Sequence, residues 1–225
     1  MNAELLSAKI LTYHFNLRPE GVLPENIDWL IPYENEETRR CMLAFYSKFY
    51  HDKRKRFFIL GINPGRFGAG VTGVPFTDPV RLEKIGLPNT FLKRQELSSV
   101  FIYDMIDACG GSELFYADYY ITSLCPLGFV KHEKNYNYYD DRQLADAVRP
   151  FIIKNIEIQI KFGADLNRVY CLGMGKNVEY LRRLNETYGW WKEVIPLPHP
   201  RWIMQYKLKQ KEHYIQLYKD TFAGK

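Results

Sequence analysis

The sequence predicts a three-layer α/β/α sandwich around a central, mainly parallel sheet of four strands. Four short apolar runs alternate along the chain with segments of helical pattern, which is typical of a parallel α/β sheet. No linker or shift in composition divides the 225 residues, so we expect a single domain over 1–225. With 46% hydrophobic and 25% charged residues, a chain of this length forms a sizeable core.

The expected helices are justified by their caps and breakers. Asn35 stands before a helix with two acidic residues in its first turn, which suit the helix dipole. Asp78 and Pro79 form a helix start, an N-cap followed by proline at the first helical position, and Gly86 ends that helix. Pro150 falls inside the longest helical pattern and predicts a kink. The expected helices cover about residues 3–17, 35–50, 78–86, 98–108, 141–162, 176–188 and 206–222.

The expected strands are apolar runs that end at turn-forming residues. The first run ends in a glycine and proline turn, Pro126 stops the second, and Gly173 follows the third. Two long segments are read as loops, a proline-containing one over 19–32 and a glycine-rich one that ends at Thr77. The expected strands cover residues 56–60, 119–124, 169–172 and 193–197.

Charge and composition exclude several classes of protein. The net charge of +5 and the pI of about 8.9 are compatible with a nucleic-acid partner without requiring one. No segment approaches the ~20 apolar residues of a membrane span, and the N-terminus lacks the features of an export signal. The four cysteines show no metal-ligand spacing. We therefore expect a cytoplasmic monomer with reduced cysteines, no metal and no membrane partner.

Two glycine-rich stretches match parts of phosphate-binding motifs without their context. The stretch from Gly68 to Gly73 has dinucleotide spacing, but Pro75 stands where the motif needs a helix to form. The stretch from Gly173 to Lys176 opens a helix after a strand, yet it lacks the rest of a P-loop. The sequence therefore predicts no cofactor at either stretch.

Polar side chains stand at the carboxyl ends of three expected strands. Asn63 follows the first strand, Ser123 lies at the end of the second and His199 follows the fourth. Parallel strands bring these ends to one crevice, so the amide, hydroxyl and imidazole are expected to share a pocket. Pro64 keeps Asn63 out of the helical region, which holds an amide at the strand end. An amide orients water but is not a strong base.

The run from Gly61 to Phe76 resembles the first motif of the uracil-DNA glycosylase superfamily. It is most similar to the single-strand-selective monofunctional (SMUG) branch, whose elements stand in register here except that Ile62 replaces a methionine. Leu-Cys-Pro-Leu at 124–127 resembles the middle motif, and the His-Pro that begins at His199 resembles the last. The resemblance implies that superfamily's α/β/α fold and a monofunctional DNA glycosylase, with DNA as partner and no cofactor.

The resemblance also implies roles for individual residues. Asn63 matches the residue that positions the attacking water. His199 matches the residue that hydrogen-bonds uracil O2 and stabilises the leaving anion. Phe76 matches the aromatic residue that stacks on the flipped base. No lysine stands in the matched motifs, so lyase chemistry through a Schiff base is not implied. The other residues expected to contact the base are Ile62, Gly65, Phe67, Gly73 and Ser123.

Two departures from the branch affect specificity and DNA contact. Ser123 stands where the branch has an asparagine that reads uracil, so we hypothesise a looser pocket that also admits xanthine or hypoxanthine. After its His-Pro the last motif differs, and an apolar triplet there is compatible with a wedge in the base stack or with core packing. The residues expected to contact DNA are Arg201, Lys207 and Lys209 at phosphates and Trp202, Ile203 and Met204 at the wedge.

Three questions stay open from the sequence. The tyrosine-rich stretch at 136–139 fits base stacking and a surface loop equally well. Nothing in the sequence decides between single- and double-stranded DNA. A non-catalytic binder of modified nucleotides or damaged DNA remains the alternative function, although the presence of both Asn63 and His199 favours the enzyme.

Overall fold

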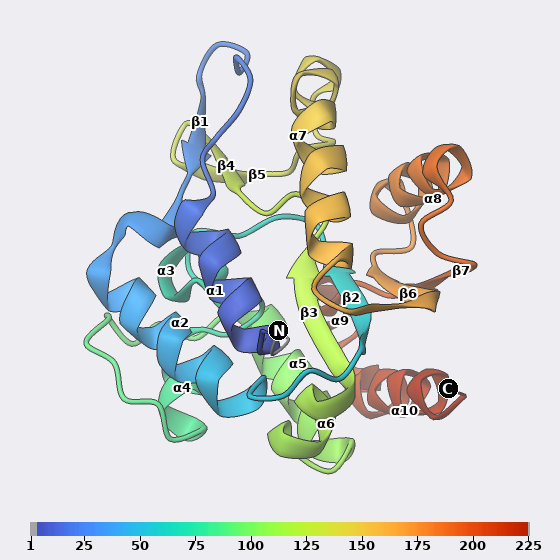
Figure 1. The fold of residues 1–225 in the computed structure, drawn as a ribbon. Helices are drawn as coiled ribbons and strands as arrows, with labels where there is room; N and C mark the ends of the chain where they lie inside the picture. The colour runs from blue at the N-terminus through green and yellow to red at the C-terminus, as the bar shows by residue number, and fades with distance from the viewer. Residues whose placement is uncertain (1–3, 225) are drawn as a thin grey trace.

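Four parallel strands form the middle layer of the computed structural model, which describes residues 4–224 (Figure 1). Their order is β3-β2-β6-β7, and every pair in this sheet is parallel. The predicted three-layer fold is therefore confirmed. β6 begins at Ala164, five residues before the expected start. The sequence did not indicate this first half as a strand, because it is polar and partly exposed, as loops are. The strands are β2 (Arg56–Gly61), β3 (Tyr119–Ser123), β6 (Ala164–Leu172) and β7 (Glu193–Leu197).

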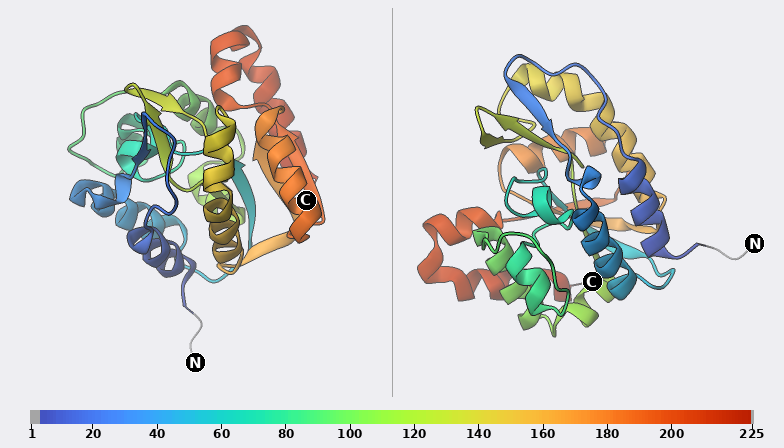
Figure 2. Two further views of the ribbon diagram at one scale, coloured as in Figure 1. Left: turned by 90° about the horizontal axis from the view of Figure 1, so that it is seen from above. Right: turned by 90° about the vertical axis from the view of Figure 1, so that its left-hand side faces the viewer.

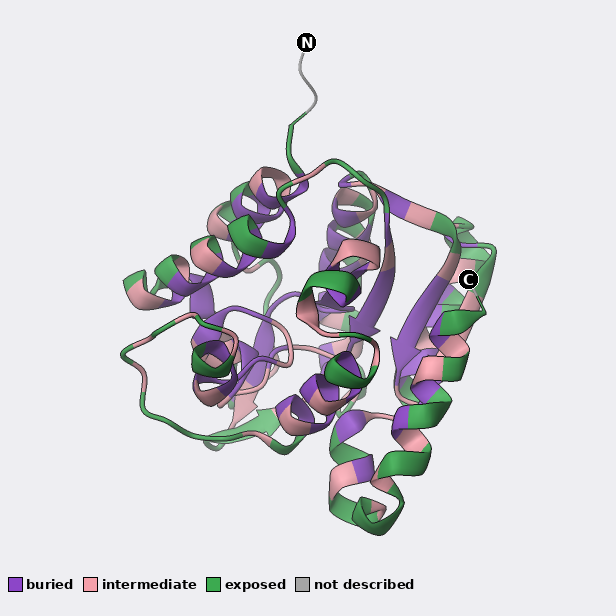
Figure 3. Ribbon diagram, turned by 90° about the horizontal axis from the view of Figure 1, so that it is seen from below, coloured by how far each residue is buried: buried purple, intermediate pink, exposed green. Residues whose placement is uncertain are grey.

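Helices cover both faces of this sheet, as Figure 3 shows by the buried strands between outwardly exposed helices. On one face, the hydroxyl of Thr122 in β3 donates to Gln159 of α7 at 2.8 Å. On the other face, Phe222 of α10 packs on Tyr119 and Tyr170. The helices are α1 (Leu6–Asn16), α2 (Glu36–Phe49), α3 (Ala69–Thr72), α4 (Pro79–Lys84), α5 (Leu97–Ala108), α6 (Ser112–Asp118), α7 (Arg142–Ile160), α8 (Lys176–Tyr188), α9 (Pro200–Tyr206) and α10 (Lys211–Ala223).

The predicted caps form as expected. The Asn35 side chain accepts a hydrogen bond from the Thr38 amide at 3.0 Å, and Asp78 accepts one from the Arg81 amide at 2.8 Å. Pro150 lies inside α7. The start expected for the first helix, residue 3, lies outside the described residues.

A second sheet, antiparallel and of order β1-β4-β5, was not expected (Figure 2). Its strands are β1 (Ile27–Leu30), β4 (Gly128–Lys131) and β5 (Lys134–Tyr136), and β1 falls in the segment expected to be a loop. Strands of three or four residues that are partly exposed give almost no periodic signal. The sheet matters because the end of β5 and the residues just after it hold the side chain of Asn63.

The C-terminal region also differs from the single helix expected over 206–222. Two helices, α9 and α10, are joined by a 3₁₀ turn at Leu208–Gln210. α9 starts at Pro200 because proline occupies its first position and the His199 side chain caps it. The His-Pro motif is therefore the start of a helix. The short helices α3 and α6 and the 3₁₀ turn Pro32–Glu34 were also missed.

His14 is a buried imidazole of α1 that the sequence does not single out. Its side chain lies among the rings of Tyr13, Tyr33 and Tyr46, and neither ring nitrogen has a hydrogen-bond partner within the described chain. Burial lowers the pKa of His14 from 6.5 to about 3. The protein therefore holds a neutral histidine in its core.

We expect His14 to make the fold sensitive to acid. The unfolded chain binds the proton first, so the free energy of unfolding falls as pH drops from about 6.5 towards the folded-state pKa of about 3. Inside that window the loss approaches about 1.4 kcal/mol per pH unit. In His14→Phe, the free energy of unfolding should change less with pH than in the wild type when urea unfolding is measured from about pH 7 to 5. His213→Gln, at an exposed histidine, should keep the wild-type slope; an unchanged slope in His14→Phe would contradict this account.

Candidate active site

A cavity of about 930 Å³ opens at the carboxyl ends of the central strands. In the sheet register, Gly61 at the end of β2 lies opposite Ser123 at the end of β3, so the segments that follow start side by side. The structure thus brings together eight of the sequence candidates. The candidates that line the cavity are Ile62, Asn63, Gly65, Phe76, Ser123, His199, Arg201 and Trp202.

The amide of Asn63 is held by the backbone at the end of β5 and just after it. Its Nδ2 donates to the carbonyl of Tyr136 at 3.2 Å, and its Oδ1 accepts from the amide of Tyr138 at 3.2 Å. These two contacts have opposite polarity, so only one orientation of the amide satisfies both. A carbonyl oxygen has two lone pairs, and the second lone pair of Oδ1 remains for a water molecule. The site therefore presents a fixed acceptor.

The imidazole of His199 is held as a neutral donor. Its Nδ1 accepts a hydrogen bond from the backbone amide of Arg201 at 3.1 Å, which places the ring proton on Nε2. Burial, with a smaller contribution from the positive charge of Arg201, lowers the pKa of His199 to about 4. At neutral pH the ring is uncharged, and Nε2 carries an N–H that is free of protein partners among residues 4–224.

Phe76 takes a backbone conformation that aromatic residues rarely adopt, with φ of 53°. This conformation places its ring 6.0 Å from that of His199, measured between centroids. The ring occupies the space beside Gly61, where an added Cβ would lie 2.9 Å from a ring carbon. A glycine at the end of β2 therefore leaves the room that Phe76 needs beside the cavity.

Ser123 lies at the end of β3, where it is 7% exposed. Within the described chain its hydroxyl makes no hydrogen bond, and the residue lines the cavity. A short side chain there leaves more space than an asparagine would. The position thus offers one rotatable hydroxyl to whatever enters.

Two of the expected base-contacting residues lie elsewhere. Phe67 lines a smaller cavity next to the first, where the guanidinium of Arg94 covers its ring. Gly73 packs against Met42 of α2, and an added Cβ would collide with the methionine sulfur. The expectation that they line the base pocket is corrected: the ring of Phe67 is used outside it, and Gly73 serves the packing of α3.

The residues expected to contact DNA divide between surface and core. Ile203 is fully buried in the hydrophobic core, which corrects its assignment to a wedge, and Met204 is partly buried against that core. Trp202 is 41% exposed and lines the cavity mouth with Arg201. The other two cations follow Trp202 in the sequence. The Nζ atom of Lys207 is 5.8 Å from the centroid of the Trp202 ring, and Lys209 lies on the exposed 3₁₀ turn.

Several cavity residues were missed from the sequence. One of them is Glu96, which lines the cavity. Burial raises the pKa of its carboxyl, and the positive charge of Arg201 lowers this pKa by a smaller amount. The tyrosine-rich stretch gives the one usable signal, but its members separate: Tyr139 lines the cavity, whereas Tyr138 is buried and donates to Asn177 at 2.8 Å. The lining residues that were missed include Glu96, Asn135, Asn137, Tyr139, Lys176 and Tyr214.

Neither a metal centre nor a membrane span is found in the part of the chain that the structure describes. Among residues 4–224, no three His, Cys, Asp or Glu side chains gather in a group that is able to hold a metal ion. None of the described helices has both the length and the apolar character needed to cross a membrane.

Comparison with known proteins decides the family. The model of the uracil DNA glycosylase superfamily matches residues 48–222, more than half of the chain. The chain belongs to the uracil-DNA glycosylase superfamily. The crystal structure of wild-type SMUG2 from Pedobacter heparinus is similar, with 44% sequence identity over 99% of this chain and 98% of that chain, and a TM-score of 0.97. This SMUG-like glycosylase therefore has a function of the uracil-DNA glycosylase type, as the first motif indicated.

Proposed function

We propose that this SMUG-like protein is a monofunctional DNA glycosylase that removes uracil flipped out of DNA, the first step of base excision repair. The observation that carries the proposal is that Asn63 and His199 line one cavity with complementary hydrogen-bonding groups. One presents a fixed acceptor for water, and the other presents a neutral N–H. The leaving base and the incoming water need these two groups.

The reaction follows from the charges that develop. Breaking the bond between C1′ and the base nitrogen leaves positive charge on the sugar and negative charge on uracil. The His199 Nε2–H hydrogen-bonds the uracil oxygen as that charge grows, while the base lies against Phe76. The cationic sugar needs only a positioned nucleophile, so water held by Asn63 Oδ1 adds its oxygen to C1′. One water proton is released to solvent, and the uracil anion takes a proton after it leaves.

A strand-scission assay tests the proposal. A uracil-containing oligonucleotide is incubated with the protein and then treated with alkali, which breaks the strand wherever a base has been removed. We expect scission at the uracil alone, and none without the alkali step. Binding to the same oligonucleotide without scission would favour the alternative function, a non-catalytic binder of damaged DNA.

The unpartnered hydroxyl of Ser123 supports a broader range of bases, with xanthine and hypoxanthine as candidates. Ser123→Asn restores the two-sided amide of the branch and fills part of the cavity. We expect its preference for uracil over xanthine to rise by about tenfold or more, because an amide left unpaired by the wrong base is costly. Single-turnover rates on oligonucleotides that carry each base would measure this. Equal preference in wild type and variant would count against a role of Ser123 in base choice.

A further inference from the structure

A second, smaller cavity of about 200 Å³ adjoins the catalytic one. The two share the walls formed by Glu96, Ser98, Asn135 and Arg201. The smaller cavity is lined in addition by residues of the loop between α4 and α5 and by the Phe67 ring. The smaller cavity therefore lies side by side with the one that holds Asn63 and His199.

Two guanidinium groups lie on the ring of Phe67. The Cζ atom of Arg94 is 3.5 Å from the ring centroid, and that of Arg66 is 5.4 Å away. The short distance places Arg94 in a cation–π contact, which orients the group while leaving N–H donors for a further partner. A third arginine, Arg201, lines the smaller cavity together with Arg94 and Phe67.

None of these three arginines forms an ion pair within the described part of the chain, although the charge of Arg201 acts on the nearby Glu96 carboxyl. No Asp or Glu oxygen lies within ion-pair distance of their side chains, and the guanidinium groups make no hydrogen bond. Glu96 is the carboxyl on the shared wall. Its oxygens lie beside the turn at Gly65 and Gly68, where an added Cβ on Gly68 would collide with Oε2. Two arginines line the cavity, a third lies on its Phe67 wall, and Glu96 is the one acidic residue in its lining, so positive charge is in excess there.

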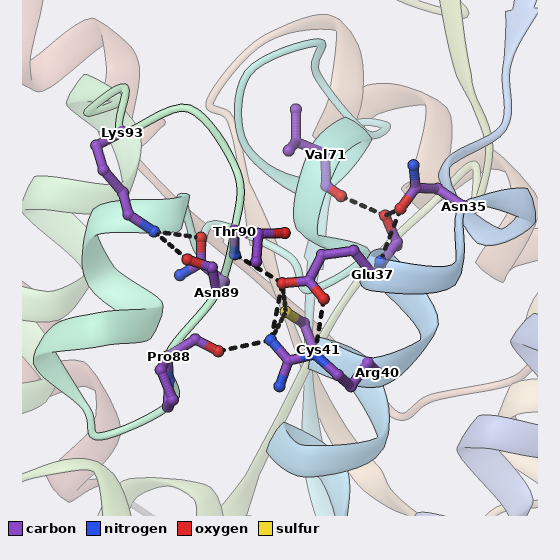
Figure 4. A network of polar contacts seen from close by, with 10 residues as sticks. Asn35, Glu37, Arg40, Cys41, Val71, Pro88, Asn89, Thr90 and Lys93 are labelled. Carbon is purple, nitrogen blue, oxygen red and sulfur yellow. Dashed lines mark hydrogen bonds and ion pairs between the residues drawn. The ribbon is translucent and has the colours of Figure 1, made fainter.

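The loop that carries Arg94 is fixed to α2 by a network of polar contacts (Figure 4). The amide of Thr90 donates to Glu37 at 2.7 Å, and Arg40 donates to the carbonyl of Pro88 at 2.7 Å. The neighbouring cation, Lys93, is already bound to Glu83 at 2.7 Å. Because the loop is anchored, binding through Arg94 does not require the whole loop to become ordered.

We propose that Arg94, Arg66 and Arg201 form a clamp for a backbone phosphate of the DNA strand, next to the flipped nucleotide. The proposal rests on the proposed function in that it takes a DNA strand to cross the catalytic cavity. Guanidinium groups match the geometry of phosphate oxygens, and the stacked Arg94 is already oriented. The ring of Phe67 is then a support for a cation, which explains why it lies outside the base pocket.

Arg94→Gln tests the clamp, with Lys93→Gln as the matched control one residue earlier in the same loop. We expect Arg94→Gln to weaken binding of uracil-containing and uracil-free DNA alike, on the order of tenfold near 0.1 M salt, and to reduce the salt slope of log Kd by about 1. Lys93→Gln should keep the wild-type Kd and slope, because Glu83 already holds that cation.

A second measurement identifies the phosphate. Oligonucleotides are made with one neutral methylphosphonate at each position in turn around the uracil. One position should weaken binding of the wild type clearly more than binding of Arg94→Gln, which has lost one of the three partners of that phosphate. Equal effects on both proteins at every position, or the same Kd for Arg94→Gln and Lys93→Gln, would overturn the clamp. Wild-type protein that fails to cleave uracil DNA would instead reject the proposed function, so the two failures are distinguishable.

Discussion

Asn63→Ala should slow uracil release by about two to three orders of magnitude while leaving the protein folded. The variant loses the side chain that Tyr136 and Tyr138 both hold, and with it the acceptor that positions water. Asn63→Asp should be similarly slow at neutral pH. A carboxylate accepts from the Tyr138 amide but cannot donate to the Tyr136 carbonyl, so the two oxygens repel and the group turns away.

Single-turnover cleavage of a uracil oligonucleotide measures this effect, with thermal unfolding to confirm the fold. Asn167→Ala is the matched control, because that asparagine is exposed on β6 and its side chain accepts a hydrogen bond from the exposed Lys192. A variant at Asn63 that cleaves as fast as the wild type would reject the mechanism. Cleavage lost together with the folded signal would instead assign Asn63 to stability.

His199→Ala should also lower the cleavage rate by about two to three orders of magnitude, because the departing base loses its hydrogen-bond donor. The wild-type rate should show no transition near 6.5, the ordinary pKa of histidine, since the ring is already neutral there. The rate should fall only as pH approaches the pKa of about 4. Protonated Nδ1 can no longer accept from the Arg201 amide, so the ring loses the contact that orients it.

Arg201→Gln is a separate test of how the cleavage rate depends on pH. The positive charge of Arg201 contributes to the low pKa of His199, so its removal should move the acid limb of the cleavage rate to higher pH. The rate is measured at saturating enzyme, where weaker DNA binding does not enter. An acid limb that stays in place, or one already centred near 6.5 in the wild type, would contradict the neutral-donor role.

The parts predicted from sequence are those with a strong local signal. Uninterrupted apolar runs identified the four central strands, and Asn35 and Asp78 identified helix starts. The ends of parallel strands meet at one edge, so the order of strands and turns along the chain is enough to place Asn63 and His199 together. Ser123 was found by the same reasoning.

What the sequence did not reveal depends on contacts between distant segments. The hairpin of β4 and β5 is short and partly exposed, and it orients Asn63 through backbone atoms that every residue type carries. Glu96 enters the cavity from a loop with no motif of its own. Ile203 lies in an apolar triplet, and only the position of α9 decides that its side chain is in the core.

The backbone hold on Asn63 has a consequence for how this enzyme diverges. A peptide carbonyl and a peptide amide orient the side chain that we propose to be catalytic. This geometry therefore depends on the path of the backbone and not on the side chains at 136 and 138. Substitutions at 136 and 138 are therefore limited by packing. Proline at 138 is also excluded, because proline has no backbone N–H to donate to Asn63. Two proteins of this fold can therefore orient the asparagine in the same way without having the same residue types at 136 and 138.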